Sequence, residues 1–271
     1  MINVIKANGE KEPFSEEKVS SSIGRAGIPK NIEDEVLSHV VSEIRENITT
    51  AEIYKHIIEF LDKSSEPNDS IRYSLKQAIM DLGPTGYPFE DYVSEILKAQ
   101  GYQTKVRQIL EGRCVTHEID VVAEKDGKKI IVEAKYHNGP GIKSDVHVAL
   151  YTKARFDDLS QKHGFAETWI ITNTKLTQDA LQYSLCSGVK AIGWNHPQTG
   201  SLRELVEEAK LYPVTSVRSL TQSQKQTLLL NQIVLCKNIC INPAQIKILG
   251  LNPDQEKEVL AELNYLCKIS N

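Results

Sequence analysis

Asp120, Glu133 and Lys135 are the residues of this chain whose types and spacing suggest catalysis. They lie in two apolar runs that are separated by Asp126-Gly127. Paired carboxylates suit Mg²⁺, which proteins hold with one or two carboxylates while waters and phosphate oxygens complete its shell. Lys135 could then hold a water nucleophile or a phosphate. The residues therefore predict a metal site that acts on phosphate.

The Asp126-Gly127 pair predicts a two-residue hairpin, because a type I′ turn needs positive φ at both central positions. Such a turn fixes the pairing of the two strands outward from the loop. The expected pairs are Lys125–Lys128, Ala123–Ile130, Val122–Ile131, Val121–Val132, Asp120–Glu133 and Glu118–Lys135.

The alternation of side chains places the last four of these residues on one face of the hairpin. The other face is expected to be core: Ile119, Val121, Ala123, Ile130, Val132 and Ala134. Carboxylates directly opposite each other have Cβ atoms roughly 5 Å apart and repel, so a cation between them would explain the pattern. A solvated face with a Glu118–Lys135 ion pair is the alternative. In the metal reading, Glu118 is expected to hold Lys135 in place.

The elements around the hairpin predict an α/β fold with a mixed sheet flanked by helices. Hydrophobic periodicity indicates helices at about 88–100, 144–163, 177–187 and 202–210, and strands at 102–109, 167–172 and 189–194. Glu90 lies just inside the first of these helices, where a glutamate also complements the helix dipole.

Residues 84 to about 212 resemble the PD-(D/E)XK nuclease superfamily, and within it the Mrr-like restriction endonucleases. The resemblance is carried by G-Y-P-F-E at 86–90, E-I-D at 118–120, E-A-K at 133–135 and T-N-T-K-L-T-Q-D-A at 172–180. It implies that Asp120, Glu133 and Glu90 bind Mg²⁺ or Mn²⁺, and that Lys135 positions the attacking water. Many Mrr-like members carry glutamine at the position of Glu133.

Four helices, at about 16–26, 31–46, 50–62 and 69–81, are expected in the amino-terminal block. This block resembles the ATP-cone, a regulatory nucleotide-binding domain, through residues 4–19, I-T-T-A-E-I at 48–53 and R-Y at 72–73. The resemblance implies that ATP or dATP binds there. Lys6 and Lys18 would reach its phosphates, and Thr50 and Tyr54 would lie near it. Ala7 departs from the pattern, in which an arginine follows the lysine.

The last part of the chain is expected to be helical, at about 221–236, 243–249 and 254–267. Its second half faintly resembles a helix-hairpin-helix, and a plain interaction or dimerisation module is the alternative. The expected domains are therefore residues 1–83, 84–213 and 214–271.

Composition favours a globular, cytoplasmic protein. No apolar run approaches the length of a membrane span. Five cysteines without framework spacing favour reduced thiols, and burial explains Cys236 and Cys240 better than zinc does. The net charge of −4 does not indicate a general nucleic-acid binder.

These observations predict a metal-dependent DNA endonuclease that is regulated by ATP or dATP, with a role in restriction or defence. It is expected to form homo-oligomers. Two alternatives stay open: an inactive, nucleotide-sensing DNA-binding regulator, and a structure-selective nuclease of the junction type.

Overall fold

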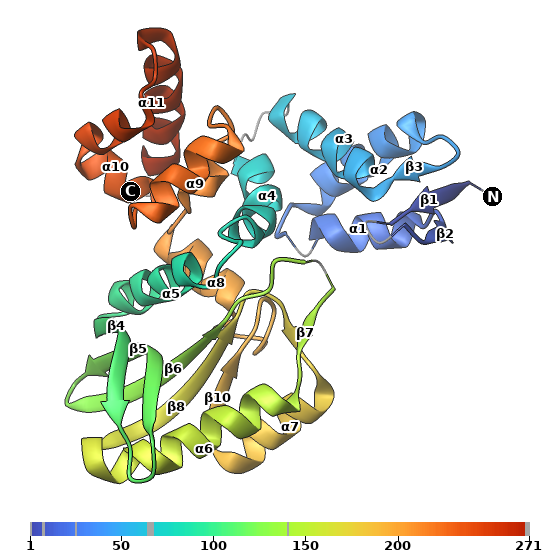
Figure 1. Ribbon diagram of the computed structural model, residues 1–271. Helices are drawn as coiled ribbons and strands as arrows, with labels where there is room; N and C mark the ends of the chain where they lie inside the picture. The colour runs from blue at the N-terminus through green and yellow to red at the C-terminus, as the bar shows by residue number, and fades with distance from the viewer. Residues whose placement is uncertain (1, 7–8, 25, 64–67, 140, 269–271) are drawn as a thin grey trace. The chain divides into compact units, whose positions relative to one another are not determined.

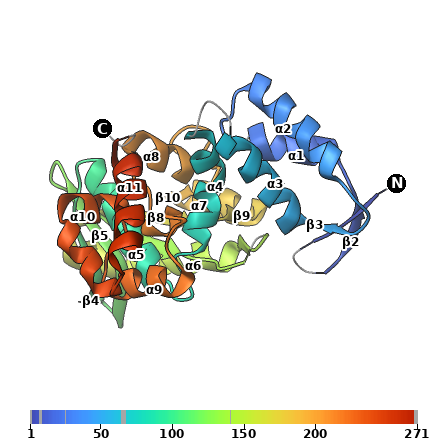
Figure 2. The same ribbon diagram turned by 90° about the horizontal axis from the view of Figure 1, so that it is seen from above.

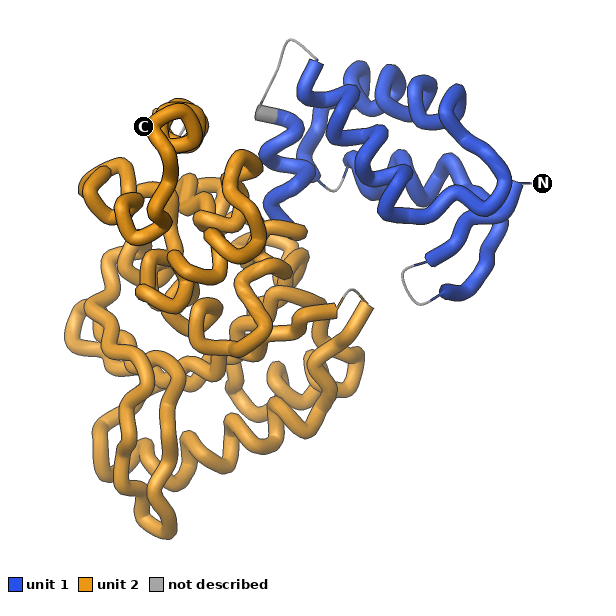
Figure 3. The backbone as a smooth tube through the Cα atoms, turned by 45° about the horizontal axis from the view of Figure 1, so that its top comes forward, with its two compact units in different colours: residues 1–76 blue, residues 77–271 orange. Residues whose placement is uncertain are grey.

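The computed structural model describes residues 2–6, 9–24, 26–63, 68–139 and 141–268. The chain forms two compact units, residues 1–76 and residues 77–271 (Figure 3). Helices occupy the amino-terminal part, a mixed sheet the centre and helices the carboxyl-terminal part, as the sequence predicts (Figure 1). Ala7 lies outside the described residues.

The first unit is mostly helical. Its elements are β1 (Asn3–Ile5), β2 (Lys11–Pro13), α1 (Glu16–Gly24), α2 (Lys30–Glu43), β3 (Ile48–Thr49), α3 (Thr50–Lys63) and the first part of α4 (Asn68–Met80). The strands form a small sheet in which β1 pairs antiparallel with β2 and parallel with β3. The strand β3 was not predicted, because two residues are too few to show alternation.

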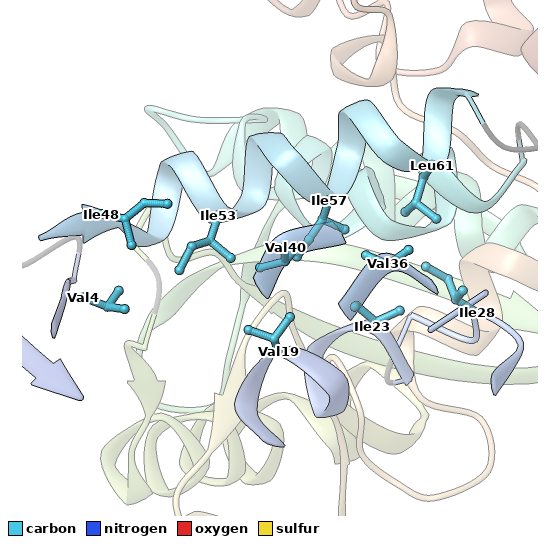
Figure 4. Close-up of a cluster of buried hydrophobic side chains, with 10 residues drawn as sticks. All are labelled: Val4, Val19, Ile23, Ile28, Val36, Val40, Ile48, Ile53, Ile57 and Leu61. Atoms are coloured by element: carbon cyan, nitrogen blue, oxygen red, sulfur yellow. The ribbon is translucent and has the colours of Figure 1, made fainter. Parts of the chain in front are cut away.

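Apolar residues at helical spacing hold the first unit together. Ile23, Val36, Val40 and Ile57 are at most 1% exposed and meet between α1, α2 and α3 (Figure 4). Val4 and Ile48 extend this core to the paired strands β1 and β3. The core thereby fixes the ends of these strands, where the predicted nucleotide-binding residues lie.

The second unit is built around a five-stranded sheet of order β10-β8-β6-β5-β4. The strands are β4 (Gln103–Glu111), β5 (Thr116–Lys125), β6 (Lys128–Lys135), β8 (Phe165–Thr172) and β10 (Val189–Ile192). The pairs β4–β5 and β5–β6 are antiparallel, whereas β6–β8 and β8–β10 are parallel. The short strands β7 (Lys143–Ser144) and β9 (Lys175–Leu176) pair separately.

The hairpin of β5 and β6 has the predicted turn and register. Asp126 and Gly127 have φ of 52° and 75°, as a type I′ turn requires. The observed pairs run from Lys125–Lys128 to Val121–Val132. The turn chemistry alone was therefore sufficient to set the register of this part of the hairpin.

Helices cover both faces of this sheet (Figure 1). They are α5 (Tyr87–Ala99), α6 (Val146–His163), α7 (Gln178–Ser187) and α8 (Leu202–Ala209). Phe89 and Tyr92 of α5 are fully buried on one face, and α6 and α7 pack against β8 and β10. None of the described helices combines the length and the apolar character that a bilayer crossing requires.

The carboxyl-terminal helices group together in both ribbon views (Figures 1 and 2). They are the 3-10 turns η1 (Val214–Ser216) and η2 (Pro243–Leu249) and the helices α9 (Gln222–Leu230), α10 (Cys236–Ile241) and α11 (Pro253–Lys268). The predicted single helix over 221–236 is wrong. Gln232 has a φ of 60°, and Val234 and Leu235 pair with the backbone near Pro213 instead.

The expectation of reduced thiols throughout is also wrong. Cys240 and Cys267 form a disulfide that joins α10 to α11. Cys236 is a buried free thiol, as its helical spacing suggested. The pairing was not predictable, because Cys267 lies 27 residues away and only tertiary packing brings it close.

Candidate functional site

The strands β5 and β6 separate at Asp120. Their last paired residues are Val121 and Val132, so the expected Asp120–Glu133 and Glu118–Lys135 pairs are not part of the ladder. The Asp120 carboxylate instead accepts a hydrogen bond from the Ala134 amide at 2.7 Å. A side chain therefore replaces the backbone bond at the point where the strands part.

The alternation of β5 is broken at the same point. Ile119 packs with Ile131, Leu159 and Phe165, and Val122 packs against this cluster too. Residues three apart cannot share a face of a regular strand, so the expected common face of Ile119 and Val121 is wrong. On β4, Arg107 has a φ of 50° where it would pair with Asp120. Both neighbouring ladders are thus interrupted around Asp120.

Asp120 is a carboxylate that this environment makes hard to ionise. Burial, and after it the nearby charge of Glu133, raise the pKa of Asp120 to about 7. The amide of Ala134 and the charge of Arg155 act in the opposite direction, and Glu90 adds to the repulsion. Asp120 is therefore close enough to Glu133 and Glu90 for their charges to act on it.

Glu133 has a partner that the sequence reasoning missed. Its Oε2 lies 2.6 Å from the Nη1 of Arg155 on α6, and the two side chains are 17% and 11% exposed. The arginine Nε is buried without a hydrogen-bond partner among the described residues. Arg155 lies on the buried face of α6 with Thr152 and Leu159, and a charged residue on such a face was the available signal.

Glu90 is held at the first turn of α5 by a second missed arginine. Arg107 lies 3.2 Å from Glu90 and 2.7 Å from Asp91. Burial raises the pKa of Glu90, and the bond from Arg107 opposes this effect. Within the described ranges, no group of three or more His, Cys, Asp or Glu side chains is close enough to hold a metal ion. The structure thus presents Asp120 and Glu133 as a carboxylate pair, with Glu90 beside it.

Lys135 lies two residues beyond Glu133 on β6. The pairing of β6 with β8 is unbroken from Ile130 to Lys135, so the side chains of Glu133 and Lys135 leave the same face. The expected role of Glu118 is not supported, because the described residues contain no Glu118–Lys135 ion pair. Glu118 is exposed, and its charge acts on Glu90 instead. The strand separation at Asp120 explains the difference.

In the first unit, Lys6 and Lys18 meet at one carboxylate. Glu12 Oε2 lies 2.9 Å from the Nζ of Lys6 and 2.8 Å from the Nζ of Lys18. The two ammonium groups hold the pKa of Glu12 below its usual value, Lys18 more than Lys6. Both lysines are exposed enough to meet a ligand, at 37% and 65%. The two lysine ammonium groups thus lie close enough together to bind one anion, here the Glu12 carboxylate, and a phosphate group could be bound in the same way.

Thr50 and Tyr54 lie on the first turns of α3. Ile5 pairs with Thr49, so Lys6 and Thr50 follow the adjacent ends of two parallel strands. Thr49 rather than Thr50 is the capping residue, since its hydroxyl accepts from the Glu52 amide at 3.1 Å. The Thr50 side chain is thereby left at a helix amino terminus, which favours anions.

Tyr54 is not isolated on its helix. Its ring stacks on that of Tyr73 of α4, with centroids 5.4 Å apart. Tyr73 belongs to the R-Y pair that carried the sequence resemblance. The structure therefore brings Lys6 and Lys18 together at Glu12, places Thr50 beside Lys6 in the sheet register, and joins Tyr54 to Tyr73.

Three family models match consecutive parts of the chain. Residues 2–79 match the ATP cone domain, residues 84–193 match the restriction endonuclease domain of the Mrr type, and residues 212–267 match the AF1548-like C-terminal domain. The resemblances to the ATP-cone and to the Mrr-like nucleases are thereby confirmed.

Relatives of known sequence and structure cover much of the chain. An uncharacterized protein of Archaeoglobus fulgidus is 37% identical over 171 residues, which are 63% of this chain and 97% of that protein. The crystal structure of a protein of unknown function, AF1548, aligns with a TM-score of 0.59 and 35% identity over 68% of this chain and 99% of that chain. Can2 from Sulfobacillus thermosulfidooxidans, in complex with cyclic tetra-adenylate, aligns over 74% of this chain and 64% of that chain. Its TM-score of 0.34 and 12% identity are too low to support an argument.

The two matched amino-terminal domains support a nuclease with nucleotide-dependent regulation. The chain belongs to the AF1548-like family, with a restriction-endonuclease domain between an ATP cone domain and the AF1548-like C-terminal domain.

Proposed function

We propose that the protein is a divalent-metal-dependent endodeoxyribonuclease of the PD-(D/E)XK type, which ATP or dATP regulates through the first unit. The observation that carries this proposal is the Asp120–Glu133 carboxylate pair, where burial and mutual repulsion raise the pKa of Asp120 to about 7. A cation beside the pair would relieve that repulsion and favour the ionised form of Asp120.

The donor set fits Mg²⁺ or Mn²⁺, because both prefer carboxylate oxygens and keep open positions for water and phosphate. Asp120 and Glu133 would hold the ion, with Glu90 beside them. When bound, the ion would supply positive charge to the phosphodiester oxygens and lower the pKa of a water molecule.

The chain's own residues would orient the substrate and the nucleophile. The Lys135 ammonium, on the same face as Glu133, would donate a hydrogen bond to the attacking water or to a phosphate oxygen. The Ala134 amide fixes the Asp120 carboxylate at 2.7 Å. Arg107 keeps Glu90 oriented at the edge of the site. Cleavage would then release a phosphate and a hydroxyl end.

The first unit would bind the regulatory nucleotide without hydrolysing it. Lys6 and Lys18 would bind its phosphates after they release Glu12, and Thr50 would present the amino terminus of α3 to them. Hydrolysis is not expected, because the sequence lacks the G-x-x-x-x-G-K-[ST] loop.

A cleavage assay tests the proposal. The purified protein is incubated with methylated and unmethylated supercoiled DNA in Mg²⁺, Mn²⁺ or EDTA, with and without ATP and dATP. The proposal expects nicked or linear DNA only with a metal ion, at a rate that a nucleotide changes. Intact DNA under every condition, from a protein that binds the metal and the DNA, would contradict it.

A second candidate function is a DNA-binding regulator that does not cut. The Arg155–Glu133 ion pair favours it, because Arg155 already supplies a cation to one of the two carboxylates. Calorimetric titration with Mn²⁺ separates the candidates. The nuclease binds the ion and loses that binding in Asp120→Asn, whereas the regulator shows no binding that depends on Asp120.

A further inference from the structure

The end of α4 and the turn after it, residues 78–83, are held by three other parts of the second unit. We call these residues the α4 exit. Thr215 donates to the Ala78 carbonyl at 2.5 Å, and Gln226 donates to the Gly83 carbonyl at 2.5 Å. Tyr136 donates its hydroxyl proton to the Met80 carbonyl. The last carbonyls of a helix usually lack protein partners, so these bonds fix the α4 exit unusually firmly.

Tyr136, the residue that directly follows Lys135 at the end of β6, makes two hydrogen bonds to the α4 exit. The Tyr136 hydroxyl oxygen also accepts the Gly83 amide at 2.7 Å, so one side chain bonds two points of the α4 exit. A Cβ atom at Gly83 would lie 2.7 Å from that oxygen, which shows how close the approach is. The Tyr136 ring packs against Phe89 at 5.7 Å between centroids. Movement of the α4 exit therefore acts directly on the end of β6.

The end of β8 makes a second connection between the same elements. Asn173 is fully buried and follows Thr172, which pairs with Lys135 in the sheet. The Asn173 Oδ1 accepts a hydrogen bond from the His137 amide at 2.9 Å, and the Asn173 Nδ2 donates one to the His137 carbonyl at 2.8 Å. The same Nδ2 lies 3.2 Å from the Met80 sulfur. Tyr136 and Asn173 thus connect the two residues that follow Lys135 to Met80.

The other end of α4 belongs to the nucleotide-binding unit. The boundary between the two units follows Lys76, within the helix. Tyr73 stacks on Tyr54, and its hydroxyl lies 3.2 Å from the Ser22 hydroxyl. A continuous helix transmits a shift or rotation of one end to the other. The helix α4 therefore joins a candidate nucleotide residue to the backbone that carries Lys135.

We propose that Tyr136 is a positioning residue, which couples α4 to Lys135 so that a nucleotide in the first unit controls how Lys135 is held. The inference rests on the proposed function, because it assigns the route by which the nucleotide regulates the nuclease site. Tyr136 acts through Lys135 and does not touch the substrate.

Tyr136→Phe in the full chain tests this role, because it keeps the ring against Phe89 and removes the two hydrogen bonds. Tyr102→Phe is the matched control, since it removes a phenol hydroxyl from the same unit, where Tyr102 packs on Trp169. For each protein, hydrogen exchange of the amides of residues 133–137 and the rate of DNA cleavage are measured with and without saturating ATP. Calorimetry verifies that ATP is bound.

In the wild type and in Tyr102→Phe, ATP is expected to change both exchange at 133–137 and cleavage. In Tyr136→Phe, both ATP effects are expected to shrink by about fivefold or more, because the loss of even one of the two hydrogen bonds is equivalent to about fivefold, while ATP still binds. Thr215→Val, which removes the bond to Ala78 from the other side of the exit, is expected to reduce the ATP effect as well, and it decides the question if Tyr136→Phe does not fold.

An ATP effect of full size in Tyr136→Phe would overturn the inference, as would ATP binding to the wild type without any change at 133–137. Wild-type protein that binds no adenine nucleotide would remove the regulatory half of the proposed function together with the inference. Wild-type protein that shows the exchange response to ATP but never cuts DNA would remove the nuclease activity and leave the coupling through Tyr136 in place. The failures are therefore distinguishable.

Discussion

The two candidate sites of this molecule have opposite charge and opposite burial. In the carboxylate site, Asp120 and Glu133 are partly buried beside each other, and Asp120 has a raised pKa. In the nucleotide site, Lys6 and Lys18 are exposed and share one carboxylate, that of Glu12. In the first site, Arg155 pairs with Glu133, and no ion pair of the described residues includes Asp120. In the second site, both lysines are paired with carboxylates, because Lys6 contacts Glu10 as well as Glu12.

This difference indicates how each site would respond to its ligand. A cation at the carboxylate site relieves a repulsion already present in the free protein, so binding and ionisation of Asp120 reinforce each other. A phosphate at the nucleotide site must first displace Glu12 from two lysines. Exposed ion pairs are weak, so that displacement costs little. Under the proposed function, the first site would therefore bind its ion without rearrangement, and the second would exchange Glu12 for the nucleotide.

The largest expected effect on the cleavage rate comes from a substitution in the carboxylate site. Asp120→Asn keeps the acceptor for the Ala134 amide but removes the charge that would hold the metal ion. We expect the cleavage rate to fall by about 10³-fold or more, because the charge stabilisation of the transition state is lost. The measurement is plasmid nicking in Mg²⁺, with Glu124→Gln, an exposed position on the same strand, as the control. Equal rates in the two variants would refute the assignment of Asp120.

The next effect is the pH dependence of metal binding. Because the pKa of Asp120 is raised to about 7, protons compete with the ion below that pH. The apparent affinity for Mn²⁺ should weaken by up to about tenfold for each unit between pH 7 and pH 5, and change little above pH 8. Calorimetric titrations at four pH values measure it. A flat profile across this range would show that Asp120 is already ionised in the free protein.

The same carboxylate should affect the stability of the metal-free protein. Because the pKa of Asp120 is higher in the folded chain than in the unfolded chain, the folded chain binds this proton more tightly, and stability is lost as pH rises from about 4 to 7. In EDTA at pH 8, Asp120→Asn should raise the free energy of unfolding by about 2 kcal/mol, after a discount for partial exposure. Near pH 4 the gain should vanish. Urea unfolding at both values tests the sign, and a variant destabilised at pH 8 would contradict the account.

The smallest effects concern the nucleotide site. Lys6→Ala and Lys18→Ala should each weaken ATP binding by about tenfold, whereas Glu12→Gln should strengthen it about threefold, because it removes the competing anion. Lys55→Ala, which removes an exposed lysine of α3, is the control. Calorimetry measures all four. If Glu12→Gln weakened binding, Glu12 would be a structural part of the site rather than a competitor, and the contrast between the two regions would be lost.

Local rules predicted most of the fold. The Asp126-Gly127 turn set the register from Lys125–Lys128 to Val121–Val132, because turn geometry and alternation are properties of neighbouring residues. The helices and the mixed sheet followed from periodicity in the same way. The break between α9 and α10 did not, because Ile233 and Val234 fit a helical pattern, whereas in the folded chain they follow Gln232, which has a φ of 60°, and are buried outside both helices.

The site was predictable in composition but not in geometry. Asp120, Glu133 and Glu90 interact as expected, yet Asp120 bonds to Ala134 instead of facing Glu133 across a ladder. The predicted register requires that the pairing of β5 and β6 continues past Val121 and Val132, and nothing local in the sequence marks the place where the two strands part. Arg155 and Arg107 were missed because they come from α6 and β4, and their contacts exist only in the folded sheet.

The most direct test of the central claim compares two lysines on one strand. Lys135→Ala removes the proposed catalytic ammonium, and Lys129→Ala removes an exposed lysine from the same strand β6. Both variants and the wild type are incubated with supercoiled plasmid in Mg²⁺. The account predicts that wild type and Lys129→Ala cut the DNA and that Lys135→Ala, with the same circular dichroism and the same Mn²⁺ affinity, does not. Full cleavage by Lys135→Ala would contradict it.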